Sequence, residues 1–415
     1  MPSIQPADKT YVGFGFGPIQ SALFLYEAHA SGNFKRLVVA EIDQAIVDAV
    51  RSNNGRYSVN IARKTEVIQD SVGTIEIYNP TNPKDRAALI QAISTSDELA
   101  TCLPSISLYD SGAGASAARI IAEGLSARAR PIPTIIYAAE NHNLAAEHLE
   151  EAIARHGAGP ARPAVQFLNT VIGKMSGIVT DVAQIASRGL APITPTIPRA
   201  ILVEEFNRIL VSRCTLPGFR RGIEAFIEKD DLLPFEEAKL YGHNAIHALI
   251  GYLAGARGLT FMSEAASNPG IMAIARKAFL DESGAALIRK HASLGDPLFT
   301  PKGYRAYAED LLERMTRPTL NDLVARICRD PIRKLGLDDR LHGTMQLALS
   351  QGIQPVNMAM GAAAALAWLA RSGERADLPK NPADLTPEIV RRFLTTLWGS
   401  SADPRADALI NLTAS

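Results

Sequence analysis

Three side chains that can cooperate in acid–base chemistry lie close together in the second half of the chain. Lys239, Asn244 and His247 follow the pattern Lys-x4-Asn-x2-His. An α-helix advances about 100° per residue, which places Asn244 about 140° and His247 about 80° around the axis from Lys239. An amine, an amide and an imidazole can therefore point into one cleft, where they could exchange a proton and orient a polar ligand.

Each of these residues also has a simpler explanation. An exposed lysine is usually a solvated charge, and an Asn or His inside a helix is more often a packing residue than a catalyst. His243 lies about 40° from Lys239 and could be a further ligand of the same substrate. We expect His243 to line the cavity.

The first forty residues follow the order strand, glycine-rich turn, helix, strand. The segment 11–17, Tyr-Val-Gly-Phe-Gly-Phe-Gly, precedes a helix-like stretch at 19–27, and an apolar strand ending in acids follows at 36–43. This order is typical of a nucleotide-binding α/β fold, in which a helix N-terminus faces a pyrophosphate.

The glycine turn departs from the usual Gly-x-Gly-x-x-Gly. Gly13 and Gly15 let the backbone turn tightly and approach a phosphate, but Pro18 takes the place of the third glycine, with Gly17 beside it. Proline is tolerated at a first helical position because its missing N–H would have no helical partner. The expected cofactor contacts in this turn are Gly13, Gly15, Phe16 and Gly17.

Glu41 strengthens the prediction of a nucleotide-binding turn, because it lies at the end of the second strand. A carboxylate there can accept hydrogen bonds from the adenosine ribose hydroxyls and would repel a 2′-phosphate, which favours NAD over NADP. The alternative is a solvated acid at the end of a strand, and the glycine turn upstream favours the ribose role.

Strand and helix patterns alternate through the first half, which predicts a doubly wound, mostly parallel sheet with helices on both faces. Strand candidates are 58–63, 73–78, 99–103 and 134–138, with helices at 86–93, 116–127 and 144–155 and an antiparallel hairpin around 69–73. The second half reads as helices at 201–211, 222–229, 236–253, 270–290, 302–315, 320–327 and 387–397. With the proline-rich segment 192–198 as a linker, the expected domains are a Rossmann-like NAD-binding domain at 1–200 and a helical domain at 201–415.

The bulk composition excludes several classes of protein. The chain has 415 residues, and its 43 Lys+Arg balance 43 Asp+Glu, which argues against nucleic acid or an anionic membrane as the main partner. Cys102, Cys214 and Cys328 lie far apart, and no His/Cys/Asp cluster has metal-ligand spacing. With no signal-peptide pattern, and an apolar stretch at 358–370 too short to span a bilayer, the expectation is a cytoplasmic protein without a metal.

Asn141 closes the strand at 134–138 and is expected on the ligand-binding edge of the sheet. It can cap the next helix, contact a substrate, or do both. Spacing alone favours the cap.

Taken together, these segments resemble the polyol-specific long-chain dehydrogenases, the group of mannitol dehydrogenase and mannitol-1-phosphate 5-dehydrogenase. The resemblance is collinear over residues 11–341. It rests on Gly13-Phe-Gly15 with Glu41, on Ala139-Glu-Asn141, on Lys239 with Asn244 and His247, and on the segments 281–288 and 330–341.

The resemblance implies an active site between an NAD-binding domain and a helical domain, with chemistry that needs no metal. Lys239 would be the general base that takes the hydroxyl proton as hydride moves to the nicotinamide. A free lysine titrates near 10.4, and burial would lower that value. Asn141 and Asn244 would stabilise the developing alkoxide, and His247 would bind a neighbouring hydroxyl and orient the lysine.

The sequence departs from the family at residues expected to contact the substrate. Gly173 and Lys174 stand where relatives carry an aspartate and an arginine. Asn169 or Lys174 could take over part of the recognition.

A basic segment follows in the helical half. Arg333, Lys334 and Arg340 could bind a phosphate or a sugar-acid carboxylate, or could form salt bridges with Asp338 and Asp339.

The sequence thus predicts an NAD-dependent oxidoreductase, a monomer or homodimer, that interconverts a secondary alcohol of a polyol, polyol phosphate or sugar acid with its ketone. Two alternatives remain: an opine or 6-phosphogluconate type of dehydrogenase, and a nucleotide-binding sensor without turnover. Gly173 favours the sensor, whereas the intact Lys239, Asn244 and His247 count against it.

Overall fold

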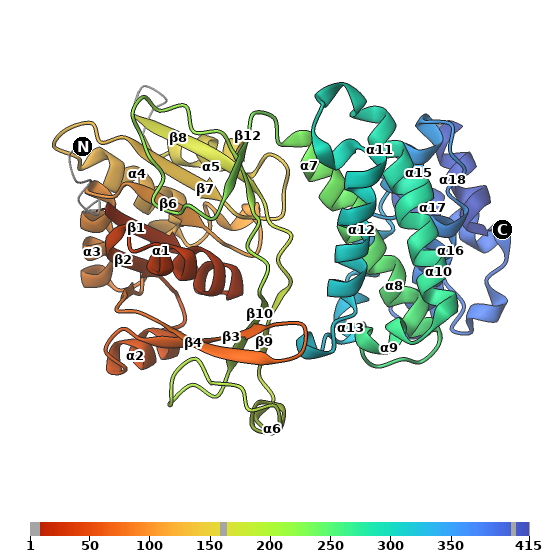
Figure 1. Ribbon diagram of the computed structural model, residues 1–415, viewed down its shortest axis with the longest axis horizontal. Helices are drawn as coiled ribbons and strands as arrows, with labels where there is room; N and C mark the ends of the chain where they lie inside the picture. Colours follow the sequence, from red (N-terminus) through yellow and green to blue (C-terminus); the bar gives the residue numbers. More distant parts are fainter. Residues whose placement is uncertain (1–8, 158–163, 400–403, 415) are drawn as a thin grey trace. The chain divides into compact units, whose positions relative to one another are not determined.

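The computed structural model describes residues 9–157, 164–399 and 404–414. The chain forms two compact units, Met1–Leu233 and Pro234–Ser415 (Figure 1). The division along the chain falls after residue 233, beyond the boundary that the sequence places at 200, because three more strands of the N-terminal unit lie between those positions.

The N-terminal unit is built on an eight-stranded sheet with strand order β12-β11-β8-β7-β6-β1-β2-β5. Its strands are β1 (Lys9–Phe14), β2 (Phe34–Ala40), β5 (Glu76–Tyr78), β6 (Glu98–Thr101), β7 (Thr134–Ala138), β8 (Val165–Val171), β11 (Leu210–Ser212) and β12 (Ile227–Lys229). All neighbours pair in parallel except β11 with β8. The expected doubly wound parallel sheet is confirmed.

Helices cover both faces of this sheet, because successive side chains of its central strands point to opposite faces and are nearly all buried. On β1, Tyr11 packs into the core cluster that contains η1 (Gln20–Phe24), α1 (Leu25–Ser31) and α2 (Gln44–Ser52). The next residue, Val12, packs into the opposite cluster, formed by α3 (Pro83–Ser94), α4 (Ala117–Ser126) and α5 (Ala145–Ala154).

A smaller sheet of order β4-β3-β10-β9 joins β3 (Tyr57–Ala62), β4 (Val67–Val72), β9 (Ser176–Val179) and β10 (Ala200–Glu204). The expected hairpin is present, but β3 turns into β4 at 63–66, and the segment expected to form the turn is itself strand β4. The short helix α6 (Val182–Ser187) follows β9.

Three expectations between residues 192 and 229 are wrong. The segments 201–211 and 222–229 contain β10, β11 and β12 rather than helices. All five residues of β10 are buried, and a short apolar run of this kind cannot be told from a buried helix by periodicity. The expected linker 192–198 is packed into the unit, since Ile193 is buried and its carbonyl accepts the Ser58 N–H at 2.9 Å.

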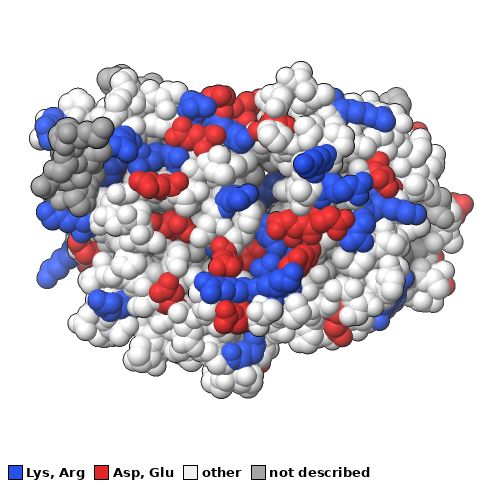
Figure 2. All heavy atoms as spheres, viewed as in Figure 1, with Lys and Arg blue, Asp and Glu red and all other residues white. Residues whose placement is uncertain are grey.

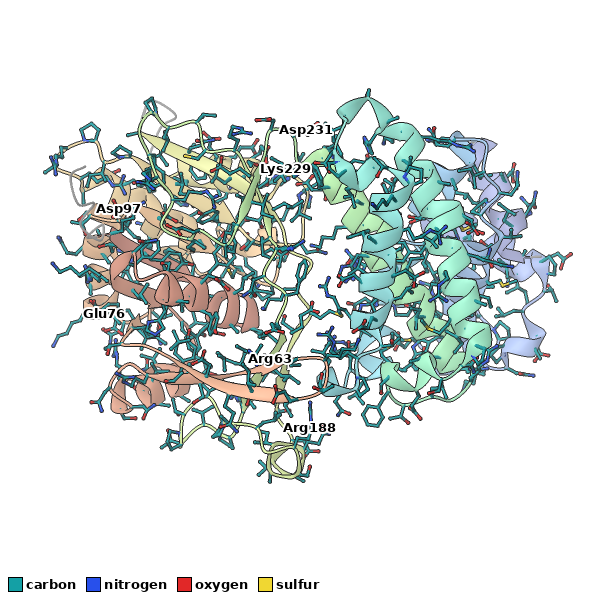
Figure 3. The ribbon with its side chains drawn as sticks, viewed as in Figure 1. Arg63, Glu76, Asp97, Arg188, Lys229 and Asp231 are labelled. Carbon is teal, nitrogen blue, oxygen red and sulfur yellow. The ribbon has the colours of Figure 1, made fainter. Side chains whose placement is uncertain are left out.

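Acidic side chains tie the amino ends of the main strands together. Asp97 accepts the backbone N–H of Thr10 at 2.8 Å, and Glu76 forms a two-point ion pair with Arg36 at 2.8 and 2.7 Å (Figure 3). The carboxyl ends, at the opposite edge, are the usual place for a ligand in such a sheet.

The C-terminal unit is helical in its described residues. Its main helices are α7 (Leu233–Glu237), η4 (Ala238–Asn244), α8 (Ala245–Ala256), α9 (Met262–Ala266), α10 (Pro269–Lys277), η5 (Ala278–Gly284), α11 (Ala285–Lys290), α12 (Pro301–Met315), α13 (Val324–Ile327), α14 (Pro331–Lys334), α15 (His342–Ser350), α16 (Val356–Ser372), α17 (Pro387–Trp398) and α18 (Pro404–Ala414). The apolar stretch at 358–370 forms the expected buried helix, α16, against α8. Within the described residues, no helix combines the length and apolarity needed to cross a bilayer.

Gly124 on α4 gives a direct test of helix packing under the main sheet. A Cβ there would lie 2.5 Å from Cβ of Ile93 on α3, closer than two carbons can approach. We expect Gly124→Ala to lower the free energy of unfolding by about 1–3 kcal/mol through overpacking. Urea unfolding measures the change. Gly114→Ala is the matched control because a Cβ there meets nothing within 4 Å, and equal effects of the two changes would contradict the packing argument.

Candidate active site

The glycine turn follows β1 and has the geometry that phosphate-binding turns need. Gly15 has φ +87°, a conformation that side chains disfavour, and a Cβ there would lie 3.0 Å from the carbonyl oxygen of Cys102. A Cβ at Gly13 would overlap the Gln20 amide. Pro18 is the first helical residue, as expected.

Glu41 directly follows β2 and is tied to the same turn. Its carboxylate accepts the backbone N–H of Phe16 at 2.8 Å and that of Asp43 at 2.7 Å. These bonds orient the carboxylate, and each oxygen can accept one more hydrogen bond, so ribose hydroxyls fit this site. The Phe16 ring is buried and packs against Tyr57, with ring centroids 4.8 Å apart. Phe16 therefore supports the turn from the core side and does not present its ring to a cofactor.

Asn141 is exposed at the carboxyl end of β7, on the edge where the sequence places it. The expectation that it caps α5 is wrong, since the N-cap residue is Leu144. Asn169 supports this helix instead: its Oδ1 accepts the Ala146 N–H and its Nδ2 donates to Glu147, both at 2.8 Å. Asn169 is therefore engaged within the N-terminal unit.

Lys174 is buried in the N-terminal unit, which argues against the expected substrate role. Its Nζ donates to the Phe206 carbonyl at 3.0 Å and to Asn207 Oδ1 at 2.5 Å. It also opposes the burial that raises the pKa of Glu27. Lys174 thus holds the segment after β10 in place.

Lys239 and Asn244 lie on η4, a π-helix, where the sequence predicted a regular α-helix. Hydrogen bonding from i to i+5 brings residues five apart to nearly the same side, so Asn244 lies much closer to Lys239 around the axis than the expected 140°. The Tyr241 carbonyl oxygen accepts hydrogen bonds from the hydroxyls of Ser283 at 2.7 Å and Thr344 at 3.2 Å. Ser283 belongs to η5, a second π-helix.

The side chain of Lys239 is half-buried, and its pKa is lowered from 10.5 to about 8. Burial is the main cause and the charge of Arg340 adds to it, whereas the buried Glu236 acts in the opposite direction. A lysine with this pKa holds a minor amine fraction at pH 7 that grows toward pH 8, and the amine is the form that a general base requires.

His247, on α8, presents a polar atom without a partner. Its Nε2 is buried and has no hydrogen-bond partner among the described residues, and the nearest carboxylate, Asp322, lies 3.7 Å away. Burial lowers the pKa of His247 to about 4, with Asp322 opposing, so the ring is neutral at pH 7. A neutral imidazole with an unsatisfied nitrogen suits a ligand hydroxyl.

His243 is buried beside His247, with ring centroids 6.1 Å apart. Burial holds its pKa well below the ordinary value, and His247 adds to the effect. It belongs to the packing around the site, in line with the expected lining role.

The three basic residues after α13 separate into different roles. Lys334 is buried and donates to the carbonyls of Ile327 and Arg329, so it closes the end of α13 rather than facing a ligand. Arg333 is exposed and pairs with Asp339 at 3.2 Å and Asp330 at 3.8 Å.

Arg340 differs from both. It is close enough to lower the pKa of Lys239, His243 and His247. Its guanidinium contacts Asp339 through Nε at 2.8 Å, and no other side chain in the described part of the protein bonds to it. Its Nη donors are thus available for an anionic ligand group beside Lys239.

Sequence reasoning missed two acids that shape these sites. Glu140 is 4% exposed, and burial raises its pKa to about 7. Its signal was an acid between an apolar strand and Asn141. Asp322, beside His247, is held at both oxygens by Arg326 at 2.6 and 2.5 Å. In the described part of the chain, no group of three or more His, Cys, Asp and Glu residues is arranged to hold a metal ion.

The charges around Lys239 predict how its pKa responds to substitution. Arg340→Met should raise the pKa because it removes a nearby positive charge, and Glu236→Gln should lower it because it removes the stabilising carboxylate. Acetylation of Lys239 by acetic anhydride across pH, followed by peptide mass spectrometry, measures both. The exposed Lys277 serves as the internal control, and shifts in the same direction for both variants would refute this electrostatic account.

Comparisons with known proteins show the family and the fold of this chain. The mannitol dehydrogenase C-terminal domain family matches residues 231–391. A Brevibacillus brevis mannitol-1-phosphate 5-dehydrogenase is 30% identical over 80% of this chain and 79% of its own, and one from Bacillus licheniformis is 29% identical over 80% of each. The fold resembles that of a Pseudomonas fluorescens mannitol 2-dehydrogenase in ternary complex with NAD and D-mannitol, with a TM-score of 0.71 and 15% identity over 98% of this chain and 91% of that one. The chain belongs to the polyol-specific long-chain dehydrogenase family, the group that contains mannitol dehydrogenase and mannitol-1-phosphate 5-dehydrogenase.

Proposed function

We propose that this protein is an NAD-dependent dehydrogenase that interconverts a secondary alcohol of a polyol, polyol phosphate or sugar acid with the ketone, with Lys239 as the general acid and base. The observation that carries the role of Lys239 is its lowered pKa, about 8, on a π-helix shared with Asn244. Family membership supports the reaction class.

The cofactor supplies the hydride acceptor, and the residues of the glycine turn fit it. Gly13 and Gly15 let the turn pack closely against Gln20 and the Cys102 carbonyl, and Glu41 is already oriented by two backbone amides. A carboxylate at this position favours NAD over NADP because it would repel a 2′-phosphate.

Oxidation of the alcohol removes a proton from its oxygen, and Lys239 is the acceptor. With a pKa of about 8, roughly one lysine in ten is an amine at pH 7. Asn244, about one π-helical turn away, would donate its amide to the developing alkoxide. Asn141 is assigned the same role from the family pattern, and His247 would bond a neighbouring hydroxyl through Nε2.

The broader context of the protein rests on its composition. Acidic and basic side chains are interspersed on the face shown in Figure 2, in line with the balanced charge of the chain. We expect a small-molecule enzyme of the cytoplasm, a monomer or homodimer, without a nucleic-acid partner.

Lys239→Ala tests the catalytic assignment. We expect turnover with NAD to fall by about 10²–10⁴-fold, because the variant lacks the proton acceptor, while NADH binding is retained. The assay is NAD reduction against hexitols, pentitols, their phosphates and aldonic acids, with NADP in parallel.

Lys277→Ala, an exposed lysine on α10, is the control. Full turnover in the Lys239 variant would reject the general-base role. NADH binding without turnover by the unaltered protein on any substrate would favour the sensor.

Arg340 tests whether the substrate is phosphorylated. The relatives at about 30% identity are named mannitol-1-phosphate 5-dehydrogenases, which makes a polyol phosphate the first candidate. We expect Arg340→Met to raise the KM of the phosphorylated substrate about tenfold or more through loss of a charge-assisted bond, and to change the KM of the unphosphorylated polyol much less. Arg333→Met, in the same segment but paired with acids, should leave both KM values unchanged. Equal effects on both substrates would argue against a phosphate contact at Arg340.

A further inference from the structure

A single buried carboxylate, Glu140, joins the loops at the ends of β6 and β7. It lies between β7 and Asn141 and is 4% exposed. Its Oε1 accepts the backbone N–H of Leu103 at 2.8 Å. Its Oε2 accepts the hydroxyls of Thr101 at 3.0 Å and Tyr109 at 2.5 Å. The loop after β6 is thus fastened to the turn that carries Asn141.

The same loop forms a wall of the glycine turn. β1, β6 and β7 are neighbours in the sheet, so their carboxyl ends lie along one edge. Cys102 donates its N–H to the Phe14 carbonyl at 3.0 Å, and its own carbonyl oxygen lies 3.0 Å from where a Cβ on Gly15 would be. A shift of the loop at 101–103 would therefore change the space beside Gly15.

Among the described residues, Glu140 forms no ion pair, and burial has the largest influence on its pKa. Burial raises this pKa to about 7, and the hydrogen bonds from Tyr109, Leu103 and Thr101 oppose the rise. Tyr109 and Cys102, which face the carboxylate, both have raised pKa values and stay neutral. The remaining titratable groups on the turn and on α5 are exposed or contact other side chains. The His142 ring packs against the His148 ring, and Glu147 accepts a hydrogen bond from Asn169. Asp110 forms ion pairs with Arg155 and His156.

The bonding pattern favours the ionised carboxylate, which accepts all three hydrogen bonds. Tyr109 has one hydroxyl hydrogen and two acceptors within reach, Glu140 Oε2 and the Ala145 carbonyl at 3.3 Å. If Oε2 is protonated, its O–H donates to the Tyr109 oxygen, and the tyrosine hydrogen turns to Ala145, the first residue of α5. The Thr101 hydroxyl then donates to a protonated oxygen, which is a weaker acceptor, so the hydrogen-bonded link between the loops after β6 and β7 weakens.

We propose that Glu140 is a positioning residue for the cofactor: its ionised carboxylate holds the turn bearing Asn141 and the loop after β6 in place beside the glycine turn, and its protonation loosens this edge. The inference rests on the proposed NAD-dependent function, because the edge is the one that the cofactor would occupy. Glu140 acts through these loops and is not assigned a contact with substrate.

NADH binding to the full-length protein, followed by fluorescence between pH 6 and 8.5, tests the proposal without a substrate. The unaltered protein should bind NADH about tenfold more weakly at pH 6 than at pH 8, the effect of losing one bond to a charged group. Glu140→Gln, which cannot ionise, should bind at the weaker level at every pH. Glu150→Gln, an exposed acid on the same helix α5, should behave like the unaltered protein. A Glu140→Gln variant that retains tight, pH-dependent binding would overturn the proposal.

Tyr109→Phe provides a second test should Glu140→Gln fail to fold, which its thermal midpoint would reveal. The Tyr109 hydroxyl lowers the pKa of Glu140, so its removal should move the midpoint of the NADH pH dependence upward. An unchanged midpoint would contradict the proposal.

The outcomes separate this inference from the proposed function. Lys239→Ala should keep the pH-dependent binding of NADH even though it loses turnover. If NADH binding stays tight in Glu140→Gln, only the positioning role is rejected. If the protein binds no NADH at any pH, both the positioning role and the proposed function are rejected.

Discussion

The chemistry proposed for the helical unit depends on the partial burial of one amine. Lys239 is half-buried next to Arg340, and burial and this positive charge destabilise its ammonium form, so its pKa falls to about 8. The π-helix brings Asn244 toward the side of Lys239, and the Tyr241 carbonyl within it accepts a hydrogen bond from the Ser283 hydroxyl at 2.7 Å. Such π-helical turns are costly and concentrate at functional sites.

The packing around this turn leaves little freedom for change. A Cβ at Gly242, on η4, would lie 2.7 Å from the Tyr304 hydroxyl, and one at Gly284, on η5, would lie 2.5 Å from the same ring. Two irregular helices therefore meet a common aromatic side chain through glycines. The site is rigid because its supports are backbone and aromatic rings rather than flexible side chains.

Carboxylates provide the corresponding supports elsewhere, since an anionic acceptor binds backbone N–H groups more strongly than a neutral one. Glu41 holds the glycine turn, Glu140 holds the loop after β6, and Glu282 holds the first residues of α16. The sequence pattern assigns Glu41 to a ligand and indicates no structural role for Glu140 or Glu282. The reason is that an acid that binds its own backbone has the same local sequence pattern as an acid that binds a ligand.

The sequence predicted those features whose signals are local. The doubly wound sheet, the glycine turn, Pro18 as the first helical residue and the buried α16 follow from patterns within a few residues. It failed where tertiary contacts decide: β10 pairs with β3, about 140 residues earlier in the chain, and Lys174 finds its partners after β10. The sequence pattern does not predict the π-helix either, because the residues of this segment still have the spacing of an ordinary α-helix.

In the proposed function, Arg340 would link substrate recognition to the strength of the base. In the free protein its positive charge helps to lower the pKa of Lys239. A phosphate bound to Arg340 would cancel that charge and place a negative group near the amine, which raises the pKa and favours the ammonium. The ammonium form is the one that donates a proton to a ketone, so a phosphorylated substrate would bias the site toward reduction, whereas a neutral polyol would leave the amine ready for oxidation. In the proposed function, a phosphate on the substrate would therefore change the preferred direction of the reaction as well as the affinity.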